Sequence, residues 1–189
     1  MSYPLLPRQG FPDAAGAPAQ PGSLDKPSSA PPSGGAPKVT TPVDVSQYVN
    51  DPCGLTPKAT ISRLGMSTRP KVTDSGHRND GKPNRLCQWG ASGTQHGVTV
   101  SLLGMGLDAQ YRKQKLAHYY ETFGPVTVDG YPAVKTTERR GERRSIRTIG
   151  LNDRESANIQ VTADSPTAAK KTTDATASAT MDTVRSGGK

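Results

Sequence analysis

The sequence predicts an α+β protein in which a single twisted antiparallel sheet is packed by helices and preceded by a disordered, proline-rich tail. Three observations lead to this prediction. Ten of the seventeen prolines fall within residues 1–42, which separates a tail from the rest of the chain. Strand patterns in the remainder are joined by short turns, which favours antiparallel pairing. Helix patterns lie between and after these strands, which indicates helices packed on a sheet.

The tail is rich in Pro, Ala, Ser and Gly, and its only aromatic residues are Tyr3 and Phe11. Such a segment cannot bury enough apolar surface to offset the entropy of ordering it. We therefore expect a disordered tether over residues 1–42, a single α+β domain over 43–185 and a flexible C-terminus over 186–189.

The first helix of the domain is expected to start at Leu55-Thr56-Pro57 and to be about two turns long. Leu55 can act as an apolar staple, Thr56 as the cap, and Pro57 as the first helical residue. Gly65 marks the end of this short helix. Residues 66–84 are polar and contain Gly76, Gly81 and Pro83, which indicates a loop.

Two strands are expected over residues 86–91 and 97–103, joined as a hairpin. In the second strand, Val98, Val100 and Leu102 alternate with Thr99 and Ser101, which is typical of a half-buried strand.

A second helix is expected to begin at Asp108, its cap, and to end at Gly124-Pro125. The apolar residues Ala109, Leu116, Tyr120 and Phe123 lie near one face of such a helix.

The remaining elements are a hairpin over residues 126–134 around an Asp129-Gly130 turn, strands over 144–151 and 156–163, and a last helix. The helix is expected to start at Ser165-Pro166 and to end at Arg185. Its inner face carries Thr173, Thr176 and Thr180 where a docked helix usually has Leu, Ile or Val. We therefore expect it to dock weakly.

Cys53 and Cys87 are the only cysteines, and 34 residues separate them. One lies in a helix-start pattern and the other in a strand pattern, which indicates a single disulfide in a protein of an oxidising compartment. The alternatives are free buried thiols in a cytosolic protein, or a metal or redox site, although such sites normally use closely spaced ligands. Trp89 follows Cys87 by two residues and is expected to cover the disulfide.

The formal net charge is +8. The tail has three cations and two acids, so the domain carries about +7, which suits either anionic partners or solubility alone. Arginine forks bind phosphates and carboxylates well, and residues 139–147 contain five arginines. The alternative is a solvated turn in which they pair with Glu138 and Glu142. The anion-binding candidates are Arg139, Arg140, Arg143, Arg144 and Arg147.

Motifs of catalysis are not found in the sequence. It contains no Gly-x-Ser-x-Gly elbow, phosphate-binding loop or His-Glu-x-x-His pair. Gly104-Met105-Gly106 lacks the third glycine of a dinucleotide-binding loop, and the three histidines form no ligand pair. No aromatic residues interleave with the arginines, so there is no specific nucleic-acid signal. We expect no enzymatic activity, no cofactor and no metal site.

The cysteines and the tail predict an extracytoplasmic or cell-surface location. No apolar run approaches the length of a membrane span, and the start lacks the apolar stretch of an export signal. If Met1 is the true start, the prediction becomes a cytoplasmic protein.

Several short motifs resemble, in their order and spacing, a domain family of unknown function from actinobacterial lipoproteins and secreted proteins. The motifs are Asp51-Pro52-Cys53-Gly54-Leu55-Thr56-Pro57, Leu64-Gly65, Cys87-Gln88-Trp89 and Gly130-Tyr131-Pro132-Ala133-Val134, and the resemblance covers residues 43–185. It implies an extracytoplasmic, often lipid-anchored α+β domain without an established activity.

The chain departs from this family's pattern in two ways. Members usually begin with a signal peptide and a lipidated cysteine, and neither is present. Many also have a second cysteine pair, at positions that correspond to Ser145 and to a residue near Thr167. Its absence implies that the last helix is less firmly fastened.

Together these observations predict a non-enzymatic, cell-envelope-associated domain that binds an unknown protein or envelope component. The alternative is a basic domain that binds an anionic polymer or lipid surface through Arg139–Arg147. An enzyme is the most distant alternative.

Overall fold

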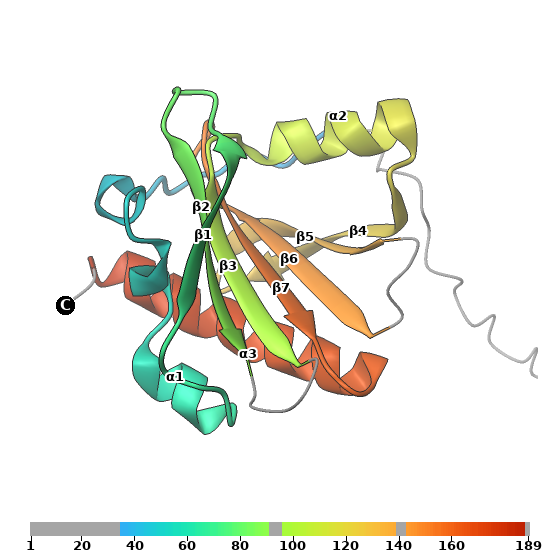
Figure 1. The fold of residues 1–189 in the computed structure, drawn as a ribbon. Helices are drawn as coiled ribbons and strands as arrows, with labels where there is room; N and C mark the ends of the chain where they lie inside the picture. Colours follow the sequence, from blue (N-terminus) through green and yellow to red (C-terminus); the bar gives the residue numbers. More distant parts are fainter. Residues whose placement is uncertain (1–34, 91–95, 139–142, 188–189) are drawn as a thin grey trace, which may run out of the picture.

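The computed structural model describes residues 35–90, 96–138 and 143–187 and confirms the α+β class (Figure 1). Seven antiparallel strands form one sheet in the order β1-β2-β3-β7-β6-β5-β4. The strands are β1 (Lys71–His77), β2 (Pro83–Gly90), β3 (Gly97–Leu103), β4 (Tyr120–Val128), β5 (Tyr131–Glu138), β6 (Arg144–Gly150) and β7 (Ser156–Thr162). The helices are η1 (Ser46–Tyr48), η2 (Pro52–Leu55), α1 (Lys58–Arg63), α2 (Leu107–Ala117) and α3 (Pro166–Arg185).

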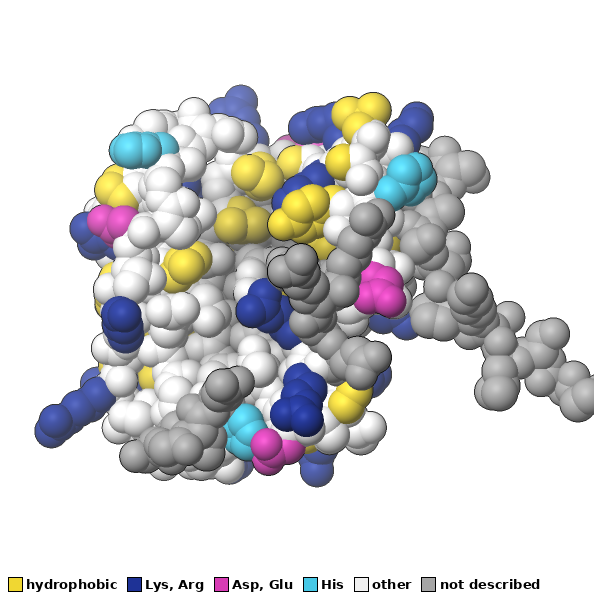
Figure 2. Space-filling view, turned by 45° about the vertical axis from the view of Figure 1, so that its right-hand side comes forward, with side chains coloured by type: hydrophobic (Ala, Val, Ile, Leu, Met, Phe, Trp, Pro, Cys, Tyr) yellow, Lys and Arg dark blue, Asp and Glu magenta, His cyan; other side chains and the backbone are white. Residues whose placement is uncertain are grey.

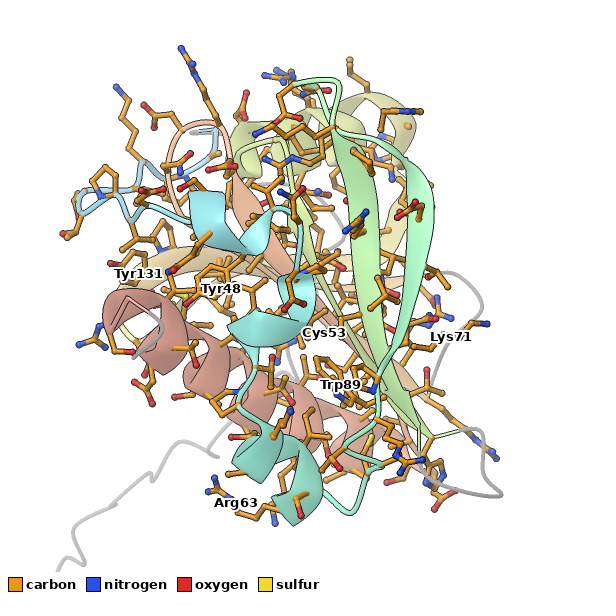
Figure 3. The ribbon with its side chains drawn as sticks, turned by 60° about the vertical axis from the view of Figure 1, so that its left-hand side comes forward. Tyr48, Cys53, Arg63, Lys71, Trp89 and Tyr131 are labelled. Atoms are coloured by element: carbon orange, nitrogen blue, oxygen red, sulfur yellow. A yellow bond between two sulfur atoms is a disulfide. The ribbon has the colours of Figure 1, made fainter. Side chains whose placement is uncertain are left out.

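One face of the sheet, here called the packed face, holds the main core. Apolar side chains alternate along the strands and meet α3, η1 and η2 on this side (Figures 1 and 3). Figure 3 shows Tyr48, Cys53 and Trp89 between these short helices and the sheet. In the described ranges, no helix is both long and apolar enough to span a membrane.

Helix α3 has the bounds that the sequence predicts. The Ser165 hydroxyl accepts a hydrogen bond from the Ala168 amide at 3.1 Å, and Pro166 occupies the first turn. Its three inward threonines are fully buried, and each hydroxyl is hydrogen-bonded. The helix therefore docks through satisfied hydroxyls as well as apolar contacts, and its weak docking stays a prediction.

The prediction that the second helix extends to Phe123 is wrong. Helix α2 ends at Ala117, and His118 takes a left-handed conformation with φ 44° that turns the chain back. The Gln114 side chain then bonds both the amide and the carbonyl of Tyr120, which starts β4. Tyr120 and Phe123 fit the helical period, but they pack beneath α2 from the neighbouring strand.

Two further expectations near the N-terminus need correction. Strand β1 occupies residues that we expected to be a loop; as an exposed edge strand, it needs no apolar alternation. Helix α1 starts one residue later than expected, with Pro57 before its first turn and no side-chain cap. Cys53 lies in η2, where the Asp51 carboxylate accepts a hydrogen bond from its amide.

Residues 35–42 belong to the fold, although the sequence assigned them to the tether. Val39 packs against the main core and Ala36 against a second cluster under α2. Immediately after them, the Val43 amide bonds the Leu151 carbonyl at 3.0 Å. The rest of the expected tether, residues 1–34, lies outside the described residues.

Candidate binding face

The second face of the sheet is divided between two kinds of side chain. Over β4, β5 and β6 it is apolar and covered by α2, which packs Leu107 and Tyr111 against Tyr120, Phe123 and Val134. Tyr111 and Phe123 meet edge to face, with ring centroids 5.0 Å apart. Over β2, β3, β7 and part of β6 the face is mainly polar, although Leu86, Leu103 and Ile146 lie on the same side and Lys71 and Arg144 lie at its margins. We call this polar region the open face.

The open face consists of six side chains from four strands. The strand register places Thr99 beside Gln88 and Gln160, and it places Asn158 between Ser101 and Thr148. All six are hydroxyl or amide side chains: Gln88, Thr99, Ser101, Thr148, Asn158 and Gln160. Each lies one residue from an apolar side chain of the packed face, because successive residues of a strand point to opposite sides.

Figure 2 looks onto this side of the molecule. A hollow runs down the middle of the view, below and to the left of α2; much of it is white, the colour of backbone and uncharged polar side chains, with some hydrophobic (yellow) and cationic (dark blue) side chains beside it. Four of the six residues, including Thr99 and Gln160, are half-buried, whereas Ser101 and Thr148 are buried at 2% and 1% exposure. The open face is therefore a recessed surface on which a ligand can reach polar groups.

Hydrogen bonds hold the amides of the open face in place. Asn158 donates its Nδ2 hydrogen to Thr148 Oγ1 at 2.9 Å, and Gln160 donates from Nε2 to Asn158 Oδ1 at 3.1 Å. A side chain held by its neighbours loses less conformational entropy when a ligand binds. The arrangement is thus ordered before any ligand arrives.

Two hydroxyl groups next to the open face are buried without a hydrogen-bond partner among the described residues. They are the Tyr111 hydroxyl under α2 and Thr136 Oγ1 on β5. Burial removes solvent from the phenol and raises the pKa of Tyr111 above its ordinary value. Tyr111 therefore stays neutral.

A separate pocket of about 860 Å³ opens at the end of the sheet, where three loops meet. Arg78 lies at this pocket with its side chain 3% exposed. Its guanidinium donates to Asp80 at 3.2 Å, to Glu155 at 2.5 Å and to the Leu102 carbonyl at 2.8 Å. These bonds tie the β1–β2 loop to the end of β3 and to the β6–β7 loop, so Arg78 has a structural role here.

Two glycines of the β3–α2 loop make this junction close. A Cβ on Gly104 would lie 2.8 Å from the Arg78 Cβ, and one on Gly106 would lie 2.4 Å from the Asp153 carbonyl oxygen. The Gly104-Met105-Gly106 motif therefore serves loop packing. Asp80 keeps its charge at the pocket rim: desolvation raises its pKa, but the Lys82 amide and Arg78 outweigh this effect and lower it.

The described part of the arginine stretch comprises Arg143, Arg144 and Arg147. Arg139 and Arg140 lie outside the described residues, Arg143 is exposed and Arg144 is half-buried. Arg147 is only 5% exposed and forms an ion pair with Asp174 of α3 at 2.6 Å. The prediction that Arg147 contributes to an anion-binding surface is therefore wrong, because its guanidinium faces the helix.

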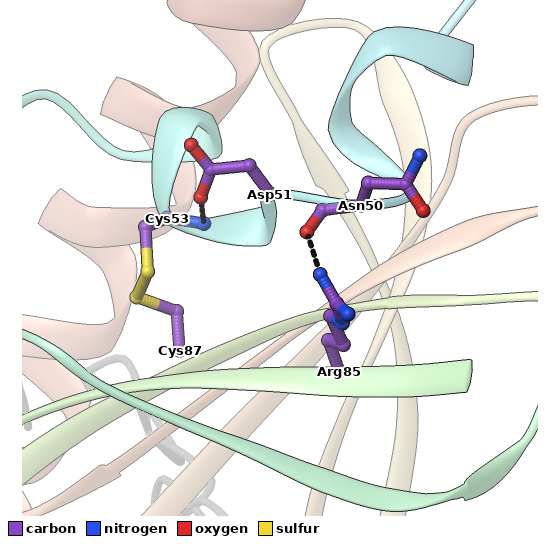
Figure 4. Close-up of a disulfide and its surroundings, with 5 residues drawn as sticks. All are labelled: Asn50, Asp51, Cys53, Arg85 and Cys87. Carbon is purple, nitrogen blue, oxygen red and sulfur yellow. Dashed lines mark hydrogen bonds between the residues drawn. A yellow bond between two sulfur atoms is a disulfide. The ribbon is translucent and has the colours of Figure 1, made fainter.

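Cys53 and Cys87 form the predicted disulfide, which joins η2 to β2 across a Cα–Cα distance of 5.2 Å (Figure 4). Nearby, Arg85 donates a hydrogen bond to the Asn50 carbonyl at 2.7 Å, which holds the segment before η2 on the same strand. Trp89 is buried in the cluster that includes Cys87, as its position two residues further along the strand predicts.

The open face was not predicted, although its residues are visible in the strand patterns of the sequence. The polar residues of β3 and β7 were used only as the solvent half of an alternating pattern. Their shared identity as uncharged amides and hydroxyls was the available signal. What the sequence could not supply was the order of the strands, which makes β3 and β7 neighbours.

Within the described ranges, no group of three or more His, Cys, Asp or Glu side chains lies close enough together to hold a metal ion. No curated protein and no solved structure matches the chain. A family match covers residues 12–181, and the chain therefore belongs to the family described as Protein of unknown function (DUF3558).

Proposed function

We propose that this protein is a non-enzymatic domain of the extracytoplasmic side of the cell that binds an envelope component through its open face. The observation that supports this proposal most strongly is the contrast between the two sides of the sheet. One side is packed by helices, whereas half of the other presents neutral, hydrogen-bonded amides and hydroxyls in a recess.

The composition of the open face fits binding better than catalysis. Its six side chains neither accept nor release protons near neutral pH, and general acid–base catalysis requires groups that do so. The charged groups of the end pocket bind each other: Arg78 holds Asp80 and Glu155. These groups stabilise loops, which explains their presence without a reaction.

The disulfide supports an extracytoplasmic location, because disulfides persist in oxidising compartments and are rare in the cytosol. Intact mass after alkylation without reductant tests this part of the proposal. Protein isolated from its native compartment should take up no alkylating agent, and two alkylated thiols would contradict the location.

A substitution in the middle of the open face tests the binding function. Thr99→Arg places a long cation between Gln88 and Gln160 and should prevent the purified protein from sedimenting with isolated envelopes. The control is Thr68→Arg, the same change at an exposed position between α1 and β1. Both variants should unfold at the wild-type temperature.

The same assay distinguishes binding through the open face from binding through an anionic-surface contact of the arginines. Exposed charges are screened over about 8 Å at physiological ionic strength, so binding through Arg143 and Arg144 would fall steeply with added salt. Binding through neutral amides should survive a salt wash. Release of the wild-type protein by salt, together with full binding of Thr99→Arg, would favour the basic surface.

A further inference from the structure

We infer that the ligand of the open face is a neutral, hydroxyl-rich chain, that is, a glycan, an inference that rests on the binding function proposed above. The spacing of the polar groups, the hydrogen bonds that they can still make, and the poor fit of other ligand classes support this ligand.

The polar side chains form two rows across the sheet. One row runs through Gln88, Thr99 and Gln160, and the other through Ser101, Asn158 and Thr148. Neighbouring strands are about 4.8 Å apart, and residues of one strand that share a face are about 6.7 Å apart. Ser101 and Thr148 are buried, so the ligand meets the four half-buried side chains, Gln88, Thr99, Asn158 and Gln160. This closely spaced set of hydrogen-bonding groups suits a chain with closely spaced polar groups.

The array is only partly satisfied by itself. The two amide–amide and amide–hydroxyl bonds use one Nδ2 hydrogen of Asn158 and one Nε2 hydrogen of Gln160. Each amide retains a second hydrogen, and Gln160 retains its carbonyl oxygen. The face therefore offers both donors and acceptors, and a hydroxyl group is the ligand group that can use either.

Other ligand classes fit less well. An apolar ligand would leave these amides and hydroxyls unpaired and desolvated. An anion would find no cation among the six side chains of the open face, because the two cations on this side of the sheet, Lys71 of β1 and Arg144 of β6, lie at its margins. An extended peptide gains most by pairing its backbone with an edge strand, and β3 and β7 are interior strands with both edges occupied.

The probe for the test is the oligosaccharide released from envelopes of the source cells, treated with protease and separated from acidic species by anion exchange. We expect this neutral fraction to shift the side-chain amide NMR signals of Asn158 and Gln160 in the full chain. The double variant Asn158→Ala/Gln160→Ala should weaken binding by about tenfold.

Two further variants keep the test decisive if the double variant is unstable. Thr99→Val retains the shape of the side chain and removes one hydroxyl, so it should weaken binding while leaving the unfolding temperature unchanged. Thr68→Val is the matched control at an exposed position and should bind like the wild type.

The outcomes separate the ligand class from the function. No binding of the neutral fraction, or shifts confined to residues outside β2, β3, β6 and β7, would overturn the glycan. If intact envelopes still bind in a Thr99→Arg-sensitive manner, and protease treatment abolishes that binding, the open face binds a protein instead. Envelope binding that ignores Thr99→Arg would overturn the proposed function as well.

Discussion

A buried guanidinium needs an acceptor, and Arg147 finds its acceptor in Asp174. The arginine side chain is 7% exposed and the aspartate side chain 43% exposed, so the pair straddles the edge of the core. Lys170 also bonds Asp174, at 2.9 Å. The sequence placed Arg147 with four neighbouring arginines because charge runs are visible in a sequence. The partner is 27 residues away and becomes visible only when α3 is docked.

Removing the counter-ion Asp174 should lower the free energy of unfolding more than removing the buried cation Arg147. Asp174→Asn leaves Arg147 buried without a counter-ion, so the free energy of unfolding should fall by roughly 2 kcal/mol. Arg147→Met removes the charge and keeps most of the apolar length, so its loss should be smaller. Chemical denaturation checks both values.

The control for this comparison is Asp182→Asn on the same helix, where the side chain is exposed. It should leave stability unchanged. An equal loss for Asp174→Asn and Asp182→Asn would mean that the ion pair contributes nothing.

At the scale of elements, the sequence predicted best where the pattern was local and strong. The bounds of α3 and β3 are those expected, because a Ser-Pro start and a five-residue alternation are local signals. The prediction failed at β1, where an exposed edge strand carries no apolar alternation. It also failed at the α2–β4 junction, where Tyr120 and Phe123 fit a helical period but pack from a strand.

Helix α3 is fastened to the segment before α1 by a pair of threonines. Thr56 and Thr180 share a hydrogen bond of 3.0 Å between their hydroxyls, and both residues are at most 2% exposed. Valine has nearly the shape of threonine but cannot make this bond. Each single change to valine therefore leaves a buried hydroxyl without its partner.

A double-mutant cycle should reveal this coupling. Thr56→Val and Thr180→Val should each lower the free energy of unfolding by about 1–2 kcal/mol. The double variant should lose less than the sum of the two, because both polar groups are gone. Thr176→Val serves as the control, since its hydroxyl bonds only a carbonyl of its own helix. Strictly additive losses would show that the two threonines act independently.

At the scale of the whole molecule, the sequence predicted the class and the disulfide. It assigned residues 35–42 to the tether, whereas they pack on the fold. Residues 35–42 include two prolines, but Val39 contacts the core beside Gly150 and Ala36 contacts the cluster under α2. Composition is an average over a segment, so it does not reveal single apolar residues, such as Val39, that pack against the core.

Two truncations test this boundary. Deletion of residues 1–34 should leave the unfolding temperature unchanged, because the composition of this segment gives it little to bury. Deletion of residues 1–42 removes Ala36 and Val39 and should cost about 1–2 kcal/mol of stability. Val39→Asp in the full chain should reproduce much of that loss. Equal stability of the two truncated forms would return the boundary to residue 42.

The open face depends on the whole fold, because it exists only when β2, β3, β7 and β6 lie side by side. The most direct measurement is site-specific photo-crosslinking in intact source cells, with the crosslinker at position 99 or, as the control, at position 68. We predict adducts with an envelope component from position 99 alone. Adducts from position 68 alone, or from both positions equally, would contradict the claim that the open face is the binding surface.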